Sequence, residues 1–207
     1  MEKTIILTKS YDIDSRLTAL GVDRDFVIRV ATQAAMARNE SVSIDPCNAA
    51  GQLAYISGVR EIRQSLLQIG WEIDRTDNIE GTINPVTGVK ILYQNVDQAC
   101  APREPKAISA KGTAVERMVN KTPFLFDYMQ DEFLQQTNVG AWFLCVSVNG
   151  DDKIRAELSR PLTIENNQFG VFAERIFVLN DDLFNNIEHD DKHDSPSDTY
   201  EVNISRK

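Results

Sequence analysis

The hydrophobic pattern of residues 141–179 is that of β-strands. Residues 141–148 are apolar at nearly every position, which is typical of a strand covered on both faces. Asn149-Gly150 fits a type I′ hairpin turn. Pro161 is expected to interrupt the ladder that follows, because it has no amide hydrogen to donate. The pattern predicts a meander of at least three strands, at residues 141–148, 153–159 and 171–179.

Hydrophobic positions recur every three to four residues in much of the N-terminal half, as in helices with one buried face. The best delimited of these helices has Asp45 as its N-cap, Pro46 at its first helical position and Gly70 as its terminating residue. Gly21 closes a shorter helix, and Thr122-Pro123 caps a later one. The predicted helices cover residues 14–20, 23–38, 46–69 and 124–135.

Further strands are predicted at residues 4–8, 71–74 and 89–96, with a tight turn over residues 84–88, and residues 199–205 alternate like one more strand. This order indicates a single α+β domain, in which N-terminal helices pack on an antiparallel sheet formed mainly by the C-terminal half. Its expected parts are a helix-rich region 1–96, a loop 97–121, a helix plus β-meander 122–180 and an acidic C-terminal segment 181–207.

Two glycines, Gly51 and Gly58, lie seven residues apart on one face of the long predicted helix. Glycine in a helix costs about 1 kcal/mol relative to alanine, so a close approach of another group is expected to compensate. One interpretation is a tight helix crossing or a break at Gly58. The other is a backbone face that admits a ligand.

The charge balance limits the classes of partner. The 207 residues include 31 acidic and 22 basic ones, a net charge of −9, and residues 181–207 alone hold eight acidic against three basic residues. This balance argues against a general nucleic-acid coat, because phosphate binding depends on lysine and arginine. No apolar run approaches the roughly 20 residues of a membrane span, and the N-terminus lacks the pattern of a secretory signal. We therefore expect a cytoplasmic protein with no membrane partner.

The cysteines and histidines favour neither a disulfide framework nor a metal site. Cys47, Cys100 and Cys145 are far apart and odd in number, so we interpret them as reduced thiols, with Cys145 buried in its apolar strand. His189 and His193 stand four residues apart in a polar segment without an H-E-x-x-H pattern. No resident metal or cofactor is predicted.

The first candidate site is a ligand- or phosphate-binding site in the predicted loop, where lysine and arginine occur beside serine and glycine. The fragment from Ser109 to Thr113 lacks the order of a Walker-type phosphate loop. The segment is therefore either a solvated connector or a binding site for nucleic acid, a nucleotide or an acidic partner. Its candidate residues are Arg103, Lys106, Lys111 and Arg117.

The second candidate site is a carboxylate set on the predicted meander. Divalent-metal nucleases place acidic side chains on adjacent strands, because magnesium prefers oxygen ligands. Glu157, Glu174 and Asp152 are the catalytic candidates under this hypothesis, although Ser159 stands where the common E-x-K order would have a lysine. Convergence of their oxygens, with those of residues 74–80, to within about 4–5 Å would support the nuclease hypothesis. The alternative is ordinary charge pairing across strands.

Glu174 and Arg175 are adjacent charged residues in an otherwise apolar predicted strand. One of them must share a face with large apolar side chains, and a buried charge without a partner costs several kcal/mol. The strand is therefore half exposed, or the pair belongs to an ion pair or a binding site, which makes Arg175 a further candidate ligand-binding residue.

These observations lead to three functional hypotheses. The preferred one is a non-catalytic interaction protein that binds a macromolecular partner, protein or nucleic acid, through its acidic surface or the basic 103–121 loop, because every catalytic set is incomplete. The first alternative is a divalent-metal-dependent nuclease or phosphodiesterase, which would require magnesium. The second is an acidic mimic of nucleic acid that inhibits a DNA-binding protein, which requires a spaced surface array of carboxylates.

Overall fold

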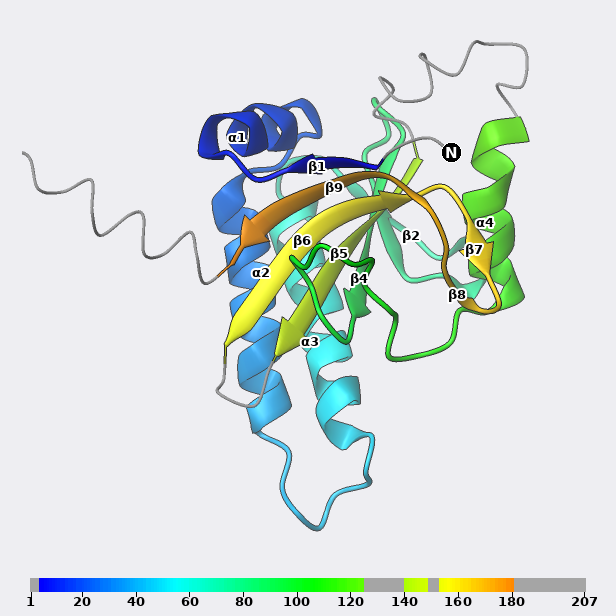
Figure 1. Ribbon diagram of the computed structural model, residues 1–207. Coiled ribbons are helices and arrows are strands. Elements are labelled where there is room, and N and C mark those ends of the chain that lie inside the picture. The colour runs from blue at the N-terminus through cyan, green and yellow to red at the C-terminus, as the bar shows by residue number, and fades with distance from the viewer. Residues whose placement is uncertain (1–3, 125–139, 149–152, 181–207) are drawn as a thin grey trace, which may run out of the picture.

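Three N-terminal helices lie along one face of a seven-stranded sheet (Figure 1). The computed structural model describes residues 4–124, 140–148 and 153–180, without the side chains of residues 121–124. Asp23, predicted as the first residue of the second helix, is instead the N-cap of α2, because its carboxylate accepts a hydrogen bond from the Phe26 amide at 2.6 Å. The helices are α1 (Ser10–Ala19), α2 (Arg24–Asn39), α3 (Ala49–Leu67) and, later in the chain, α4 (Thr113–Phe124).

The sheet has the strand order β1-β9-β6-β5-β4-β3-β2. Four of its six neighbouring pairs are antiparallel, and the pairs β1–β9 and β4–β5 are parallel. The predicted α+β class is therefore confirmed. The sheet strands are β1 (Ile5–Leu7), β2 (Glu72–Asp74), β3 (Gly81–Ile83), β4 (Val89–Asn95), β5 (Gly140–Val148), β6 (Ile154–Pro161) and β9 (Phe172–Leu179), and a separate hairpin pairs β7 (Ile164–Glu165) with β8 (Gln168–Phe169).

A hydrophobic core lies on each face of the sheet. On the helical face, alternate residues of β6 such as Ala156 and Leu158 pack with residues of α2 and α3. On the opposite face, Phe143 and Cys145 of β5 pack under the segment 96–107, α4 and the β7–β8 hairpin. Burial on both faces explains why residues 141–148 are apolar at nearly every position.

Three predicted helix boundaries are wrong. α1 begins at Ser10 rather than at residue 14. α3 begins at Ala49 rather than Pro46, because Asp45 is used in the preceding turn, where its carboxylate accepts a hydrogen bond from the Val42 amide at 3.0 Å. Thr122-Pro123 lies at the end of α4 rather than before a new helix, and residues 125–135 lie outside the described part of the chain. The predicted ends at Gly21 and Gly70 are confirmed by left-handed φ angles of 80° and 87°.

The predicted strands are also confirmed with two differences. The short strand β3 was not predicted, and it lies between β2 and β4, because the chain returns twice between Asp74 and Val89. β6 extends to Pro161, and its register with β9 shifts between Arg160 and Pro161, where the proline was expected to disturb the ladder. Asn149-Gly150 and residues 199–205 fall outside the described residues.

Candidate functional site

Glu157 and Arg175 form a buried ion pair between β6 and β9. Arg175 Nε and Nη2 donate to Glu157 Oε1 and Oε2 at 2.9 and 2.7 Å. The Glu157 carboxylate also accepts hydrogen bonds from the Cys100 amide at 2.6 Å and from the Ser159 hydroxyl at 2.8 Å. Four donors fill the acceptor positions of a carboxylate, so this glutamate is fully hydrogen-bonded within the protein.

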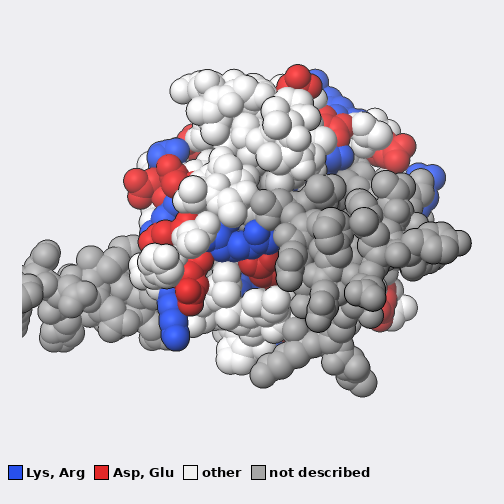
Figure 2. Space-filling view, turned by 90° about the horizontal axis from the view of Figure 1, so that it is seen from above, with Lys and Arg blue, Asp and Glu red and all other residues white. Residues whose placement is uncertain are grey.

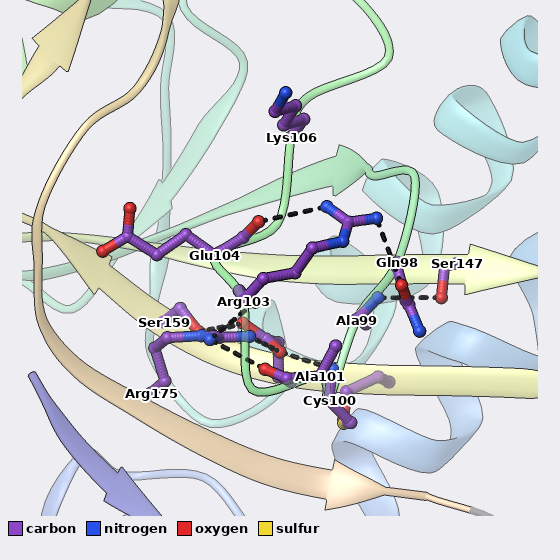
Figure 3. Close-up of polar contacts among 12 residues, drawn as sticks. Gln98, Ala99, Cys100, Ala101, Arg103, Glu104, Lys106, Ser147, Ser159 and Arg175 are labelled. Carbon is purple, nitrogen blue, oxygen red and sulfur yellow. Dashed lines mark hydrogen bonds and ion pairs between the residues drawn. The ribbon is translucent and has the colours of Figure 1, made fainter.

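The same arginine holds the loop that covers this face of the sheet. Arg175 Nη1 donates to the carbonyls of Ala101 and Arg103 at 3.0 and 3.1 Å, and Figure 3 shows its guanidinium directed at this loop. Nearby, the Ala99 amide donates to the Ser147 hydroxyl at 3.0 Å. Charge pairing across strands, the alternative to a metal site, is therefore present between Arg175 and Glu157, and the arginine also attaches the loop to the sheet.

Glu174 lies on the opposite face of the sheet, against α1. Its carboxylate accepts two hydrogen bonds from Arg16, both at 2.8 Å, and the Arg16 guanidinium stands 5.4 Å from the centre of the Trp142 ring. Both residues of the Glu174-Arg175 pair are buried, at 4% and 1% exposure. Each therefore faces a different core and has its own partner.

The catalytic candidates do not come together in the described part of the chain. The sheet separates Glu157 from Glu174, and Asp152 lies outside the described residues. The carboxylates of the earlier strands are paired separately: Asp74 with Lys90, and Glu80 with Arg63 and with Arg75. Among the described residues, no group of three or more His, Cys, Asp or Glu side chains could hold a metal ion. His189 and His193 are also outside that part.

The basic residues of the predicted loop have different environments. Lys106 and Arg117 are exposed, and Figure 3 shows Lys106 directed away from the Arg175 contacts. Arg103 is half exposed and forms an ion pair with Asp97 at 2.9 Å. Lys111 is buried. The segment 96–107 is held to the sheet by the hydrogen bonds from Arg175 and is closed by the Val96–Ala107 bridge. It therefore covers the sheet in an ordered way and does not form an extended basic surface.

Lys111 is a buried cation whose hydrogen-bond partner is neutral. Its ammonium donates to the Gln94 side-chain oxygen and stands 5.0 and 4.9 Å from the ring centres of Phe143 and Phe169. No carboxylate pairs with it among the described residues. Burial lowers its pKa to about 8, because desolvation disfavours the charged form.

Replacing Lys111 with methionine is expected to raise the free energy of unfolding by about 1 kcal/mol at pH 7, where the buried charge is destabilising. The native lysine has a pKa of about 8, and an unfolded one titrates near 10.4. The unfolded state therefore binds more protons between these values, and wild-type stability rises with pH there. The difference in the free energy of unfolding between Lys111→Met and wild type should therefore become smaller from pH 8 to pH 10, as measured by urea denaturation. A difference that stays constant over this range would contradict the assignment.

The cysteines fit their interpretation as free thiols. All three are unpaired; Cys100 and Cys145 are buried, whereas Cys47 is exposed. Burial and then the nearby Glu157 carboxylate raise the pKa of both buried thiols. These two cysteines are therefore protonated and unreactive near neutral pH.

Two hollows along α3 were not predicted as such. The first, which we call the α3 groove, has a volume of about 470 Å³ and an apolar floor that includes Tyr55 and Ile56. Its charged residues are Arg60, Arg63, Arg75 and Glu80. The second, which we call the Gly51 cavity, has a volume of about 710 Å³ and lies where the start of α3, the end of β4 and the segment around Ser109 meet.

The paired glycines of α3 were the sequence signal that could have located the Gly51 cavity. At Gly58 an added Cβ would stand 2.3 Å from the Tyr93 ring, so the predicted close approach is confirmed there. At Gly51 an added Cβ would meet no atom within 4 Å, and the residue lines the cavity. The group close to Gly58 belongs to β4, and α3 continues through Gly58, so the expected helix crossing or break is wrong. The ligand interpretation stays a prediction for Gly51.

No helix in the described part of the chain is long and apolar enough to cross a membrane. Comparisons of the chain with protein-family models, with curated proteins and with solved structures find no match. The functional argument therefore depends on the geometry of these residues.

Proposed function

We propose that this protein is a non-catalytic interaction protein and that the α3 groove binds a segment of a partner protein. The observation that carries the proposal is a row of uncovered apolar side chains beside arginines. Tyr55, Ile56 and Leu67 are 39%, 52% and 41% exposed, and all three line the groove with Arg60. Tyrosine and arginine in a concave apolar setting are the residue types enriched at binding hot spots.

The charge of the groove specifies the chemistry of the partner. Three arginines and one carboxylate line it, in a chain whose net charge is −9. Glu80 is already shared by Arg63 and Arg75, and Arg60 has no carboxylate partner among the described residues. The groove is therefore suited to an amphipathic segment that offers apolar anchors and acidic residues.

The other hypotheses draw less support from the described residues. Glu157 already accepts four hydrogen bonds, which leaves it poorly placed to bind magnesium. The described side chains of the 103–121 loop include three exposed cations, Arg103, Lys106 and Arg117, and Arg103 is already paired with Asp97. These are few for the electrostatic binding of nucleic acid. On the face shown in Figure 2, acidic side chains lie beside basic ones, rather than in the spaced carboxylate array that a nucleic-acid mimic requires.

Selection of peptides from a random library against the folded protein tests this proposal. Peptides that bind wild type are expected to combine apolar anchors with acidic residues, and Arg60→Glu and Ile56→Asp should each weaken their binding at least about tenfold. Fluorescence anisotropy measures the affinities. Val86→Asp is the matched control, because Val86 is 91% exposed in a turn and does not line the groove.

Two outcomes would contradict the proposal. Selected peptides without acidic residues, or peptides whose affinity survives both groove variants, would place binding elsewhere. Labelled single-stranded DNA and RNA of random sequence form the second arm of the experiment. Salt-dependent binding of these strands that is lost in Arg60→Glu would assign the groove to nucleic acid instead.

A further inference from the structure

The Gly51 cavity has a floor that is held by side-chain hydrogen bonds. Asn95 at the end of β4 donates from Nδ2 to the Gly51 carbonyl at 2.9 Å, and its Oδ1 accepts from the Tyr93 hydroxyl at 2.9 Å. Gln94, which is 7% exposed, donates to the Asn95 carbonyl at 2.8 Å. The strand end and the first turn of α3 are therefore fixed relative to each other before any ligand enters.

The charge that lines this cavity is positive. Arg38 lines it, and none of its described lining residues is acidic, although the whole chain carries 31 acidic residues. Within the described part of the chain, no carboxylate pairs with Arg38. The Lys111 ammonium is bonded to the side chain of Gln94, which lines the cavity, but it packs against Phe143 and Phe169 in the core on the other face of the sheet. The cation that lines the cavity is therefore Arg38, and it has no counter-ion among the described residues.

Neutral donors and apolar surface complete the lining. Asn48 and Gln52 contribute side-chain amides, and Asn48 makes no capping hydrogen bond to the helix that it precedes. Tyr55, Ile56 and Ile108 contribute apolar surface. The open side of Gly51 adds room beside the backbone, since a Cβ there would meet nothing within 4 Å. A volume of about 710 Å³ is within the range of small-molecule sites.

We propose that the Gly51 cavity binds a small anionic molecule, in which a phosphate or carboxylate group is attached to an aromatic or aliphatic body. Arg38 pairs with the anionic group, and the amides of Asn48 and Gln52 complete its hydrogen bonds. The body of the ligand packs against Tyr55 and Ile56. The site is independent of the groove proposal, although these two residues line both hollows.

Alkylation of Cys47 reports occupation of this cavity directly. Cys47 lines the cavity and is the exposed cysteine of the three, so neutral iodoacetamide should modify it in the folded protein while Cys100 and Cys145 stay protected. The probes are phenyl phosphate and benzoate, which separate the two anionic groups, with benzylamine and benzyl alcohol as cationic and neutral counterparts. Mass spectrometry follows the alkylation rate as each probe is titrated.

Phenyl phosphate, benzoate or both are expected to slow the alkylation of Cys47, whereas benzylamine and benzyl alcohol are not. Arg38→Gln should raise the concentration for half-maximal protection at least about tenfold, because it removes a charge-assisted contact. Gly51→Leu should abolish protection by filling the cavity. Arg60→Gln is the matched control, since it removes the same charge from the neighbouring groove and should leave protection unchanged.

Each remaining outcome would overturn the proposal. The cavity does not select anions if neither anion protects Cys47, or if benzylamine protects it equally well. The same conclusion follows if the protection survives Arg38→Gln. Backbone amide NMR spectra provide a second measurement that needs no variant. Phenyl phosphate or benzoate should shift the resonances of Gly51, Asn95 and Ser109, and shifts confined to other residues would also count against the site.

Discussion

Replacing Glu157 with alanine is expected to lower the free energy of unfolding by about 3–5 kcal/mol, because it leaves the Arg175 guanidinium buried without its carboxylate. The arginine side chain is 1% exposed, so water cannot replace the lost partner in the native structure. The Cys100 amide and the Ser159 hydroxyl lose their acceptor as well. A loss of this size is a large part of the stability of an ordinary domain.

Urea denaturation followed by circular dichroism measures this effect. The control is Asp14→Ala, which removes a 3.0 Å pair with Arg24 whose acidic side chain is 54% exposed, and it should cost less than about 1 kcal/mol. The double variant Glu157→Leu with Arg175→Met should lose less than Glu157→Ala, since no charge is then left unpaired. A loss in Glu157→Ala no greater than that of the control would contradict the structural role.

The same variant separates the structural role from the nuclease alternative. Wild type and Glu157→Ala can both be incubated with plasmid DNA and RNA in the presence of magnesium or manganese. Metal-dependent cleavage by wild type that disappears in a fully folded Glu157→Ala variant would restore the nuclease alternative. The four hydrogen bonds that Glu157 accepts in the folded protein occupy the acceptor positions that a metal ion would need. The same carboxylate therefore cannot keep these bonds and also bind the metal ion of a nuclease.

Local patterns predicted most of the fold. The alternation of β6, the helix end at Gly21 and the apolar run of β5 each depend on residues that are close in sequence, so the sequence pattern was sufficient to predict them. The errors arose where a local signal had a competing use. Asp45 is a good N-cap residue, but its carboxylate bonds the Val42 amide instead, and the three residues of β3 are too short to show a period.

The sequence showed that Glu174 and Arg175 are adjacent charges in an otherwise apolar strand, but it did not identify their partners. Arg16 is 158 residues from Glu174 in the chain, and Glu157 is 18 residues from Arg175. The Gly51 cavity similarly combines Arg38, Asn95 and Ser109, which come together through the packing of α2, α3 and β4. Such sites depend on tertiary contacts, which hydrophobic periodicity does not specify.

The glycines of α3 give the second large prediction, because alanine at the two positions should act in opposite directions. Gly58→Ala is expected to lower the free energy of unfolding by about 1–3 kcal/mol, since the new methyl group would overlap the Tyr93 ring. Tyr93 is 3% exposed and its hydroxyl is bonded to Asn95, so the ring cannot move aside freely. Gly51→Ala should leave stability unchanged or raise it by up to about 1 kcal/mol through helix propensity.

Urea denaturation of the two variants tests this difference, and a second substitution identifies its cause. If the Tyr93 ring is the obstacle, Gly58→Ala should cost much less in a Tyr93→Leu background than in wild type, which a double-mutant cycle measures as a coupling energy of about 1–3 kcal/mol. Additive effects, or equal stabilities for Gly51→Ala and Gly58→Ala, would contradict the contact. The Tyr93 hydroxyl also bonds Asn95 at the floor of the Gly51 cavity, so Gly58→Ala should in addition shift the Asn95 resonances. Gly51→Ala should change the hydrogen bonds of Asn95 to Tyr93 and to the Gly51 carbonyl little.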